Sequence, residues 1–440
     1  MIVEKFGGTS LGNPSRIRHV VELCNDGQPK IVVLSAMSGT TNALESMCTL
    51  LYQDNKAEVS NRLEELSAVY AGVIDDLFAS QDYRKAATEM LRERLDHIRA
   101  YTLDMFTPFE ERAILAQGEL ISTALVQLYC EESGIESHLL PALDFMRIDQ
   151  NHEPDYWYIK SNLERLLKES KGVLYITQGY ICRNHFGEID NLKRGGSDYT
   201  ASIIGVAVAA EKIQIWTDID GMHNNDPRIV EETRPIERLT FDEAAELAYF
   251  GAKILHPSSV LPARKANIPV VLKNTLDSNK KGTVISNEPS GDFIKAVAAK
   301  DGITAIKIKS ERMLLAYGFL RRVFEVFERH QVAIDMITTS EVAVSLTIDT
   351  NKDISPLVGE LESYGIVEVD NDQGIVCVVG HLLQSEEGHA AKIFDALREI
   401  PLRMISYGGS KNNVSILINA EHKAKTLKAL NQGLFKLDLN

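Results

Sequence analysis

Residues 5–10 read Lys-Phe-Gly-Gly-Thr-Ser and follow an apolar start that predicts a β-strand. Paired glycines lack the Cβ that would hold backbone N–H groups away from an oxyanion, and two hydroxyls follow just before a helix predicted over residues 14–23. The lysine adds a point charge. This pattern is typical of a phosphate cradle, although an ordinary Gly-Gly turn beside a surface lysine has the same residues. The residues concerned are Lys5, Gly7, Gly8, Thr9 and Ser10.

Two other phosphate-binding patterns are absent from the sequence. No Gly-Lys-Ser/Thr follows the glycines, so the stretch is not a P-loop, and no Gly-x-Gly-x-x-Gly occurs that would mark a dinucleotide fold. Whether residues 5–10 bind phosphate therefore has to be judged from the motifs that follow them.

The composition limits the classes of function. A chain of 440 residues is too long for one ordinary core and predicts a large domain with one or two small ones. The net charge of -15 argues against a nucleic-acid partner, which needs a broad basic surface, but it leaves room for a nucleotide bound by local positive charge.

Cysteine usage and apolar runs predict a location. The five cysteines are scattered and odd in number, which fits neither a disulfide framework nor a zinc site. The start of the chain has no signal-peptide pattern, and the apolar run at residues 201–210 is too short to span a bilayer. We therefore expect a cytoplasmic protein without a membrane partner.

Strands and helices alternate over the first 290 residues. Apolar runs at 30–37, 173–178, 212–216 and 268–272 predict buried parallel strands, and helical patterns separate them. This order predicts an α/β domain with a largely parallel sheet over residues 1–290. The charged helical pattern near 55–110 predicts a helical hairpin, or lid, inserted into that domain.

A second glycine-rich motif stands before a helix. Residues 193–200 read Lys-Arg-Gly-Gly-Ser-Asp-Tyr-Thr and precede the apolar residues 201–210. Two glycines with a serine and an aspartate form another candidate anion-binding helix N-terminus, although Asp198 also fits a simple N-cap. Together with Lys5, a Thr-Asp pair at 217–218 and Lys253, these residues suggest phosphoryl transfer.

The pattern changes after residues 287–291, which read as a linker. Short strands and helices then follow the βαββαβ order twice, so we expect ferredoxin-like units at 301–371 and 374–440. The second copy lacks a last strand. Residues 293–299 could take its place, which would interlock the two units.

Taken together, these motifs resemble the aspartate kinase family. The resemblance covers essentially the whole chain and implies an amino-acid kinase (carbamate-kinase-like) three-layer α/β domain followed by paired ACT regulatory domains. The segments that carry it are Lys5 to Ser10, Leu34 to Ala36, Gly118-Glu119, Arg194 to Thr200, Trp216 to Asp218 and Gly251 to Pro257.

The resemblance implies ATP-dependent phosphorylation of the L-aspartate β-carboxylate to 4-phospho-L-aspartate, the first step toward lysine, threonine and methionine. A carboxylate with a pKa of about 3.9 is already ionised at neutral pH, so the reaction needs no general base. Mg²⁺ would be held by phosphates and water, and we expect no protein metal ligand.

By similarity, the site residues fall into three groups. The residues expected to act in catalysis are Lys5, Asp198 and Lys253. Those expected to seat aspartate are Ser35, Thr41, Glu119, Arg194, Gly195, Gly196 and Ser197. Those expected to line the nucleotide site are Lys5, Gly7, Gly8, Thr9, Ser10, Thr217, Asp218, His223, Arg228, Lys253 and Ile254.

Several of these residues have a plainer interpretation. Glu119 could be a solvated helix residue, and Arg228 could simply cap its own loop. His256 fits a structural role better than a catalytic one. The chain also departs from the family at Lys193, where glycine is usual, and at His223, where tyrosine is common.

In the first small repeat, several residues resemble the lysine pocket of lysine-inhibited aspartate kinases, and a plain packing unit for subunit pairing is the alternative. Lysine is preferred over threonine on resemblance alone, and such units usually bind effectors between chains, which implies a homodimer or larger homo-oligomer. The residues concerned are Met313, Tyr317, Gly318, Phe319, Leu320, Asp335, Ser340 and Glu341.

Two other functions stay open on the sequence alone. One is a different amino-acid kinase, acting on glutamate or acetylglutamate. The other is a catalytically silent amino-acid sensor. The presence of Lys5, Asp198 and Lys253 argues against the sensor.

Overall fold

The computed structural model describes residues 1–102, 105–192, 195–251, 255–289, 293–310, 317–350, 352–381 and 387–435. The chain divides into two compact units, one formed by residues 1–222 with 255–288 and the other by residues 223–254 with 289–440. The predicted residues Lys193, Arg194, Lys253, Ile254 and Met313 lie outside the described residues.

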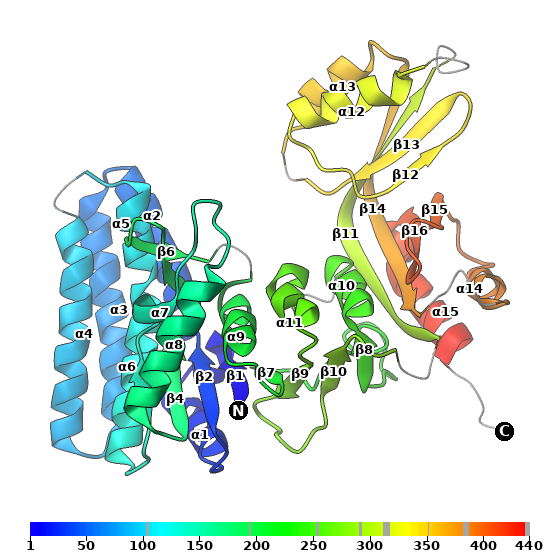
Figure 1. Cartoon of the computed structure of the whole chain (residues 1–440). Coiled ribbons are helices and arrows are strands. Elements are labelled where there is room, and N and C mark those ends of the chain that lie inside the picture. Colours follow the sequence, from blue (N-terminus) through cyan, green and yellow to red (C-terminus); the bar gives the residue numbers. More distant parts are fainter. Residues whose placement is uncertain are drawn as a thin grey trace. The chain divides into compact units, whose positions relative to one another are not determined.

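The first unit is built on a largely parallel sheet with the strand order β3-β4-β2-β1-β7-β9-β10, in which β10 is antiparallel to β9 (Figure 1). Its strands are β1 (Ile2–Phe6), β2 (Lys30–Leu34), β3 (His138–Leu140), β4 (Leu174–Gln178), β7 (Ile213–Thr217), β9 (Val270–Asn274) and β10 (Thr283–Ser286).

Helices cover both faces of this sheet. On one face, α1 (Pro14–Cys24) and α6 (Gln117–Glu132) pack their buried side chains on β2 and β4 in one apolar core. On the other face, α9 (Gly196–Ala207) lies against β1, β2 and β7, with α8 (Tyr156–Ser170) beside it. The predicted α/β fold with a largely parallel sheet is confirmed.

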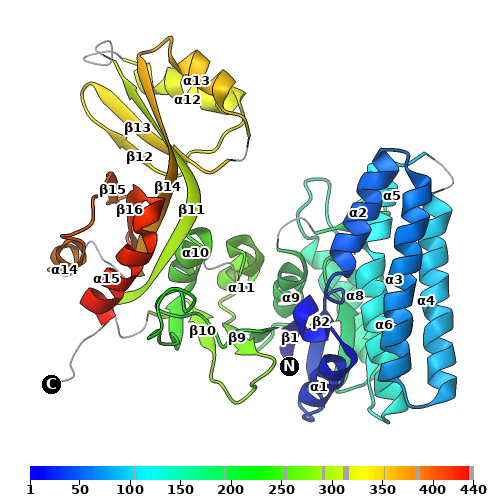
Figure 2. The same cartoon turned by 180° about the vertical axis from the view of Figure 1, so that it is seen from behind.

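The helical insert is a hairpin of α3 (Lys56–Leu77) and α4 (Gln81–Tyr101). α4 packs beside α6, α3 packs beside α1 and α2, and both helices contribute to the apolar core that holds α6 (Figures 1 and 2). Their buried residues recur at helical spacing, which joins the insert to the main core rather than leaving it as a separate body. The remaining elements of this unit are η1 (Gly8–Leu11), α2 (Thr40–Tyr52), α5 (Pro108–Leu115), α7 (Ala142–Phe145), β5 (Ile181–Arg183), β6 (Ile189–Asn191), η2 (Pro257–Val260) and α11 (Leu261–Lys265).

One helical stretch in the described residues, Pro108–Glu132, is long and apolar enough to cross a membrane by length and composition. Its most apolar window is 67% buried in the first unit, and a core helix of a globular domain passes the same test. The stretch is therefore weak evidence for a membrane span.

The second unit holds a sheet with the strand order β12-β13-β11-β14-β16-β15, in which neighbouring strands pair antiparallel. Residues 223–254 belong to the same unit, and Val230 lies in the core that the second ferredoxin-like repeat forms. The elements are β8 (Arg238–Thr240), α10 (Phe241–Tyr249), β11 (Ile294–Lys309), α12 (Phe319–Arg329), β12 (Ile337–Thr339), β13 (Ala343–Ile348), α13 (Ser355–Leu361), β14 (Ile366–Gly380), α14 (His389–Ala396), β15 (Met404–Tyr407), β16 (Asn413–Asn419), η4 (Ala420–His422) and α15 (Lys423–Phe435).

Two long strands link the repeats. The second half of β11 pairs with the first half of β14, and the first half of β11, from Ile294, pairs with the second half of β14. The sequence predicted separate short strands here, with residues 293–299 standing apart from the unit at 301–371 and a new unit starting at 374. In the structure the register shifts around Ile303, and Gly302 takes a positive φ of 75°, so the strand continues through a bulge instead of turning.

Candidate active site

The carboxyl ends of four neighbouring parallel strands bring the predicted motifs together. β1 lies between β2 and β7, and β4 lies beside β2, so the loops that follow all four leave the same edge of the sheet. Ligands of open α/β sheets bind outside this edge. Residues 7–10, 35–39, 179–180 and 217–218 therefore surround one region of the first unit.

Lys5 and Asp198 form the central ion pair of this edge. Lys5 stands near the end of β1, and its Nζ lies 2.7 Å from Oδ1 of Asp198 in the first turn of α9, with each side chain less than one-fifth exposed. Gly195 precedes α9 in the left-handed conformation, with a φ of 71°, which turns the chain into the helix. The arrangement places a cation beside a helix N-terminus, where an anion is favoured.

The Gly-Gly loop packs tightly on the loop after β2. A Cβ built on Gly8 would lie 2.8 Å from the carbonyl oxygen of Ala36, and the N–H of Ser38 donates to the carbonyl oxygen of Gly8 at 3.2 Å. Gly8 is thus required by this close approach of two backbones. Ser10 joins the loop to the strand end at Thr275 through a 2.7 Å hydroxyl contact.

Ser35 and Ser197 link the two glycine-rich motifs. The hydroxyl of Ser35 donates to Oγ of Ser197 over 2.9 Å, and the hydroxyl of Ser122 on α6 donates to the carbonyl oxygen of Ser35 over 2.8 Å. Gly179 leaves room for Ser197, since its Cβ would lie 2.3 Å from that hydroxyl oxygen. The structure thereby joins residues about 160 positions apart in the sequence.

Glu119 is a buried carboxyl group, 5% exposed, beneath the same edge. Its Oε1 accepts a hydrogen bond from the Ala36 N–H at 3.2 Å. Burial raises the pKa of Glu119 to about 7, although that hydrogen bond and the charge of Lys5 act in the opposite direction. A solvated surface position, the plainer interpretation of this residue, is wrong because the side chain is enclosed.

The helical insert reaches the site through Tyr70 on α3. Its hydroxyl lies 2.8 Å from Oγ1 of Thr40, the first residue of α2, and both side chains are buried. The adjacent Thr41 is the half-buried residue that the sequence assigned to aspartate. The sequence did not single out Tyr70 or Ser122. Ser122 lies three residues after Glu119 on the same helical face, which could have indicated it, whereas Tyr70 reads as an ordinary core residue.

The predicted nucleotide residues lie in two places. Thr217 ends β7 in the first unit and Asp218 follows it, and the Thr217 hydroxyl donates to Asp218 at 3.1 Å. His223 and Arg228 belong to the second unit. There Nδ1 of His223 lies 2.8 Å from the hydroxyl of Thr233, and Arg228, whose side chain is 84% exposed, binds Asp226 through two side-chain nitrogens.

The predicted effector residues lie in the first ferredoxin-like repeat. Gly318 precedes α12 with a φ of 79°, and Phe319 is buried at the start of that helix. Oδ1 of Asp335 accepts a hydrogen bond from the Tyr249 hydroxyl of α10, whereas its Oδ2 is buried without a hydrogen-bond partner among the described residues. Tyr317, Ser340 and Glu341 are exposed, and Leu320 is partly buried.

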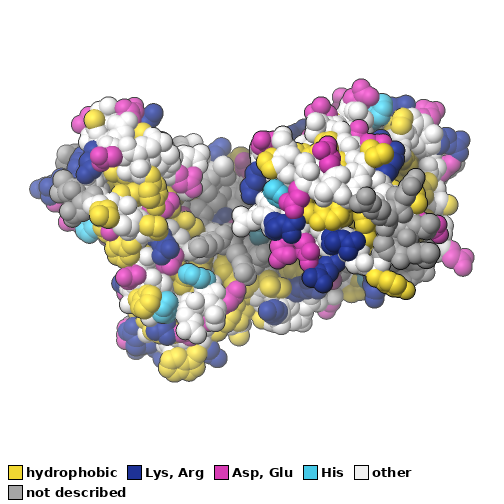
Figure 3. Space-filling model, turned by 90° about the horizontal axis from the view of Figure 1, so that it is seen from above, with side chains coloured by type: hydrophobic (Ala, Val, Ile, Leu, Met, Phe, Trp, Pro, Cys, Tyr) yellow, Lys and Arg dark blue, Asp and Glu magenta, His cyan; other side chains and the backbone are white. Residues whose placement is uncertain are grey.

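Basic and acidic side chains are interspersed on the face drawn in Figure 3, and the described residues form no broad basic stripe on it. The four-strand edge with its lysine, glycine-rich loops and helix N-terminus defines the class of protein, a kinase of the amino acid kinase family, whose model matches residues 1–274. An ACT domain model matches residues 376–434.

Within that class the chain belongs to the aspartokinases. The lysine-sensitive aspartokinase 3 of Escherichia coli strain K12 is 32% identical over 99% of this chain and 99% of its own length. The structure of E. coli aspartokinase III in complex with lysine and aspartate, in the T-state, superposes with a TM-score of 0.84 at 31% identity, covering 99% of this chain and 100% of that one. The same enzyme with aspartate and ADP, in the R-state, gives 0.81 at 31% identity and the same coverage.

Proposed function

We propose that this chain is an aspartate kinase, which transfers the γ-phosphoryl group of ATP to the β-carboxylate of L-aspartate. The observation that carries this proposal is the Lys5–Asp198 ion pair at the edge where both glycine-rich motifs meet. The aspartokinase family membership and the ADP-bound and aspartate-bound relatives support it.

The chemistry needs charge screening more than proton transfer. A carboxylate oxygen of aspartate attacks the γ-phosphorus while the bond to the departing ADP oxygen breaks, and both reactants are anions. Lys5 stabilises charge on the transferring phosphoryl group, with Asp198 fixing the position of its ammonium. The amide of Gly8 and the N-terminus of α9 add donors, whereas the Gly7 amide donates to the carbonyl oxygen of Trp216.

The substrate residues complete this arrangement. Ser35, Thr41 and Ser197 offer hydroxyls to aspartate, with Gly195 and Gly196 beside them, and the Glu119 carboxyl group faces the substrate ammonium. We also assign Arg194 to a substrate carboxylate, and Lys253, Ile254, His223 and Arg228 to the nucleotide. Arg194, Lys253 and Ile254 lie outside the described residues, and His223 and Arg228 lie in the second unit.

Mg²⁺ would enter with ATP. It dehydrates reluctantly and is usually held by phosphate oxygens and water. In the described part of the chain no three His, Cys, Asp or Glu side chains gather as a metal site. Mg²⁺ would screen charge on the phosphates, while Lys5 acts on the transferring group.

We also propose how the kinase is regulated and how its chains assemble. Lysine would inhibit through the first ACT repeat, with its ammonium near Asp335 and Glu341 and its carboxylate at the start of α12. We further propose a homodimer or larger homo-oligomer paired through ACT domains, and a cytoplasmic location. The lysine-sensitive relative supports the choice of effector.

The test is ADP release by the purified full chain with ATP, Mg²⁺ and L-aspartate, while hydroxylamine traps the acyl phosphate. Aspartate-dependent ADP release with matching hydroxamate, and none with glutamate, is the expected result. Turnover with glutamate instead would indicate another amino-acid kinase, and no turnover by folded protein would indicate an amino-acid sensor.

A further inference from the structure

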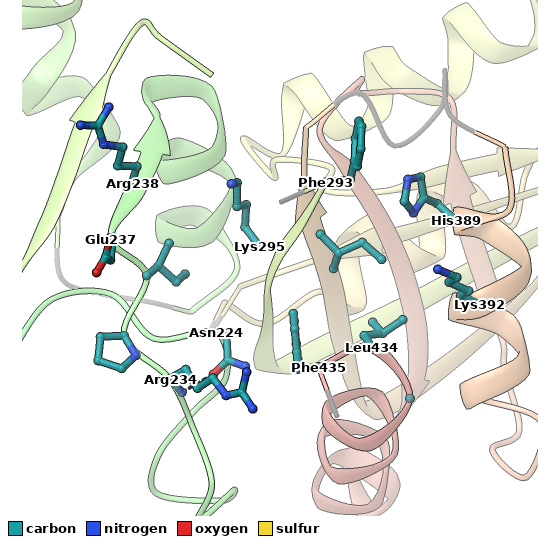
Figure 4. A pocket seen from close by; sticks show the side chains of 14 residues that line it. Asn224, Arg234, Glu237, Arg238, Phe293, Lys295, His389, Lys392, Leu434 and Phe435 are labelled. Carbon is teal, nitrogen blue, oxygen red and sulfur yellow. Dashed lines mark hydrogen bonds between the residues drawn. The ribbon is translucent and has the colours of Figure 1, made fainter. Parts of the chain in front are cut away.

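A cavity of about 780 Å³ lies within the second unit, away from the residues assigned above to lysine. Its walls are the segment before and within β8, the start of β11, and the helices α14 and α15 (Figure 4). Small-molecule pockets typically measure about 300–1,000 Å³, so the volume suits a metabolite.

Positive charge stands on two sides of this cavity. Arg234 lies on the wall before β8, and Lys392 projects from α14 on the other side (Figure 4). Neither side chain forms an ion pair or hydrogen bond with another residue in the described part of the chain. Lys295 and Arg238 also line the cavity, whereas Glu237 is the acidic residue in the lining. In a chain of net charge -15, this local excess of cations favours an anion.

Another polar residue in the lining is His389, the first residue of α14. Its Nδ1 is buried and has no hydrogen-bond partner among the described residues. A buried polar atom without a partner is costly, and a bound acceptor or donor would relieve that cost. The N-terminus of α14 adds a partial positive charge at the same place.

Apolar side chains also line the cavity. The ring of Phe293, which is 41% exposed, lies 5.2 Å from the ring of His389, and Phe435 and Leu434 extend the apolar surface (Figure 4). Exposed aromatic rings favour a flat apolar body that stacks on them. The cavity therefore combines an anion-binding rim with an apolar interior.

We propose that this cavity is a second effector site, which binds a small organic anion with a flat apolar body. The anionic group lies between Arg234 and Lys392 near His389, and the apolar body packs on Phe293 and Phe435. The segment that contributes Arg234 also contains His223 and Arg228, so occupancy alters the binding of ATP. That regulatory consequence rests on the proposed kinase function, whereas ligand binding does not.

The binding test uses the full chain and 8-anilinonaphthalene-1-sulfonate, a probe that combines an aromatic body with a sulfonate. Fluorescence titrations are run on the wild type, on Arg234→Gln/Lys392→Gln, and on the control Lys428→Gln, an exposed α15 lysine outside the lining. The expected result is about tenfold weaker binding in the double variant, since charge-assisted contacts are lost, and an unchanged affinity in the control. Equal affinity in all three proteins, or no binding to the wild type, would overturn the proposal.

Competition then identifies the anionic group. Displacement of the probe by AMP assigns a phosphate-bearing ligand, and displacement by phenylpyruvate assigns a carboxylate. Displacement by neither would overturn the assignment of an organic anion. The effect on ATP binding is tested separately, by measuring the KM for ATP in the presence of the displacing compound. The binding titrations do not depend on kinase activity, so they give a result even if the chain is not a kinase.

Discussion

Among the described acidic side chains, Asp198 alone forms an ion pair with Lys5. Removing the charge of Lys5 therefore tests the role of this side chain in the proposed active site. Replacement by methionine keeps the length of the side chain and removes the charge. We expect Lys5→Met to lower kcat by about 10²–10³-fold, the usual loss when a donor to the transition state is removed. Steady-state ADP release checks this.

The matched control for Lys5→Met is Lys265→Met, an exposed lysine at the end of α11 in the same unit. Because the substitution leaves the Asp198 carboxylate unpaired, thermal unfolding is measured alongside to separate stability from catalysis. A loss of kcat smaller than about tenfold in folded protein would contradict the role assigned to Lys5.

Glu119 makes stability depend on pH. Its folded pKa of about 7 lies above the ordinary value of 4.5, so the folded state keeps a proton that the unfolded state releases. The free energy of unfolding therefore falls as pH rises from about 4.5 to about 7, by roughly 3 kcal/mol at most, and stays lower above that range. Glu119→Gln should lack this decline.

Urea unfolding at about pH 5 and about pH 8 measures the effect of Glu119. The wild type should lose stability relative to Glu119→Gln between the two values. Parallel pH profiles for the two proteins would show that the Glu119 carboxyl group does not carry the shift.

At the scale of elements, the loop after β1 depends on the contact between Gly8 and the loop after β2. An alanine Cβ at this position would meet the backbone oxygen of Ala36 at 2.8 Å, and a backbone atom cannot rotate away. We expect Gly8→Ala to displace the loop amides and raise the KM for ATP about tenfold. Initial rates at varied ATP check this.

Gly72→Ala is the control for Gly8→Ala. Gly72 lies on α3 with open space around its Cβ position, so alanine there should stabilise the helix by about 0.5–1 kcal/mol and leave the KM for ATP unchanged. An equal change of the KM for ATP in both variants would contradict a specific requirement for glycine at position 8.

At the scale of the whole molecule, the proposed lysine site in the first repeat must be coupled to the kinase site. Asp335 accepts a hydrogen bond from Tyr249, which stands two residues before Gly251 in the segment that the family motif places at the nucleotide site. Asp335→Asn keeps an acceptor for Tyr249 and removes the charge that would pair with a lysine ammonium. We expect the lysine concentration for half-inhibition to rise at least about tenfold.

Inhibition curves on the full chain test Asp335→Asn, with Asp353→Asn as the control. Asp353 is an exposed residue of the same repeat whose carboxylate bonds only to Ser355 among the described residues. Unchanged lysine inhibition in Asp335→Asn would exclude this carboxylate from the effector site.

Much of the architecture could be predicted from local sequence. Apolar runs of strand length, helical periodicity and Gly-rich breaks carry local information, so the parallel sheet, the α3–α4 hairpin and the two ferredoxin-like repeats all follow from the pattern. The long strands β11 and β14 were less predictable. Whether Asp301-Gly302 turns or bulges depends on the partner strand, which local sequence does not contain.

The sequence by itself determined which residues could carry the chemistry: a lysine after a strand, two Gly-Gly motifs before helices, and a Gly-Glu pair on α6. Only the tertiary structure decided how they meet. The parallel order of β4, β2, β1 and β7 puts Lys5 against Asp198, and packing beneath Ala36 buries Glu119 and raises its pKa. Distance, burial and desolvation arise from contacts between segments far apart in the chain, and for that reason no local pattern could supply them.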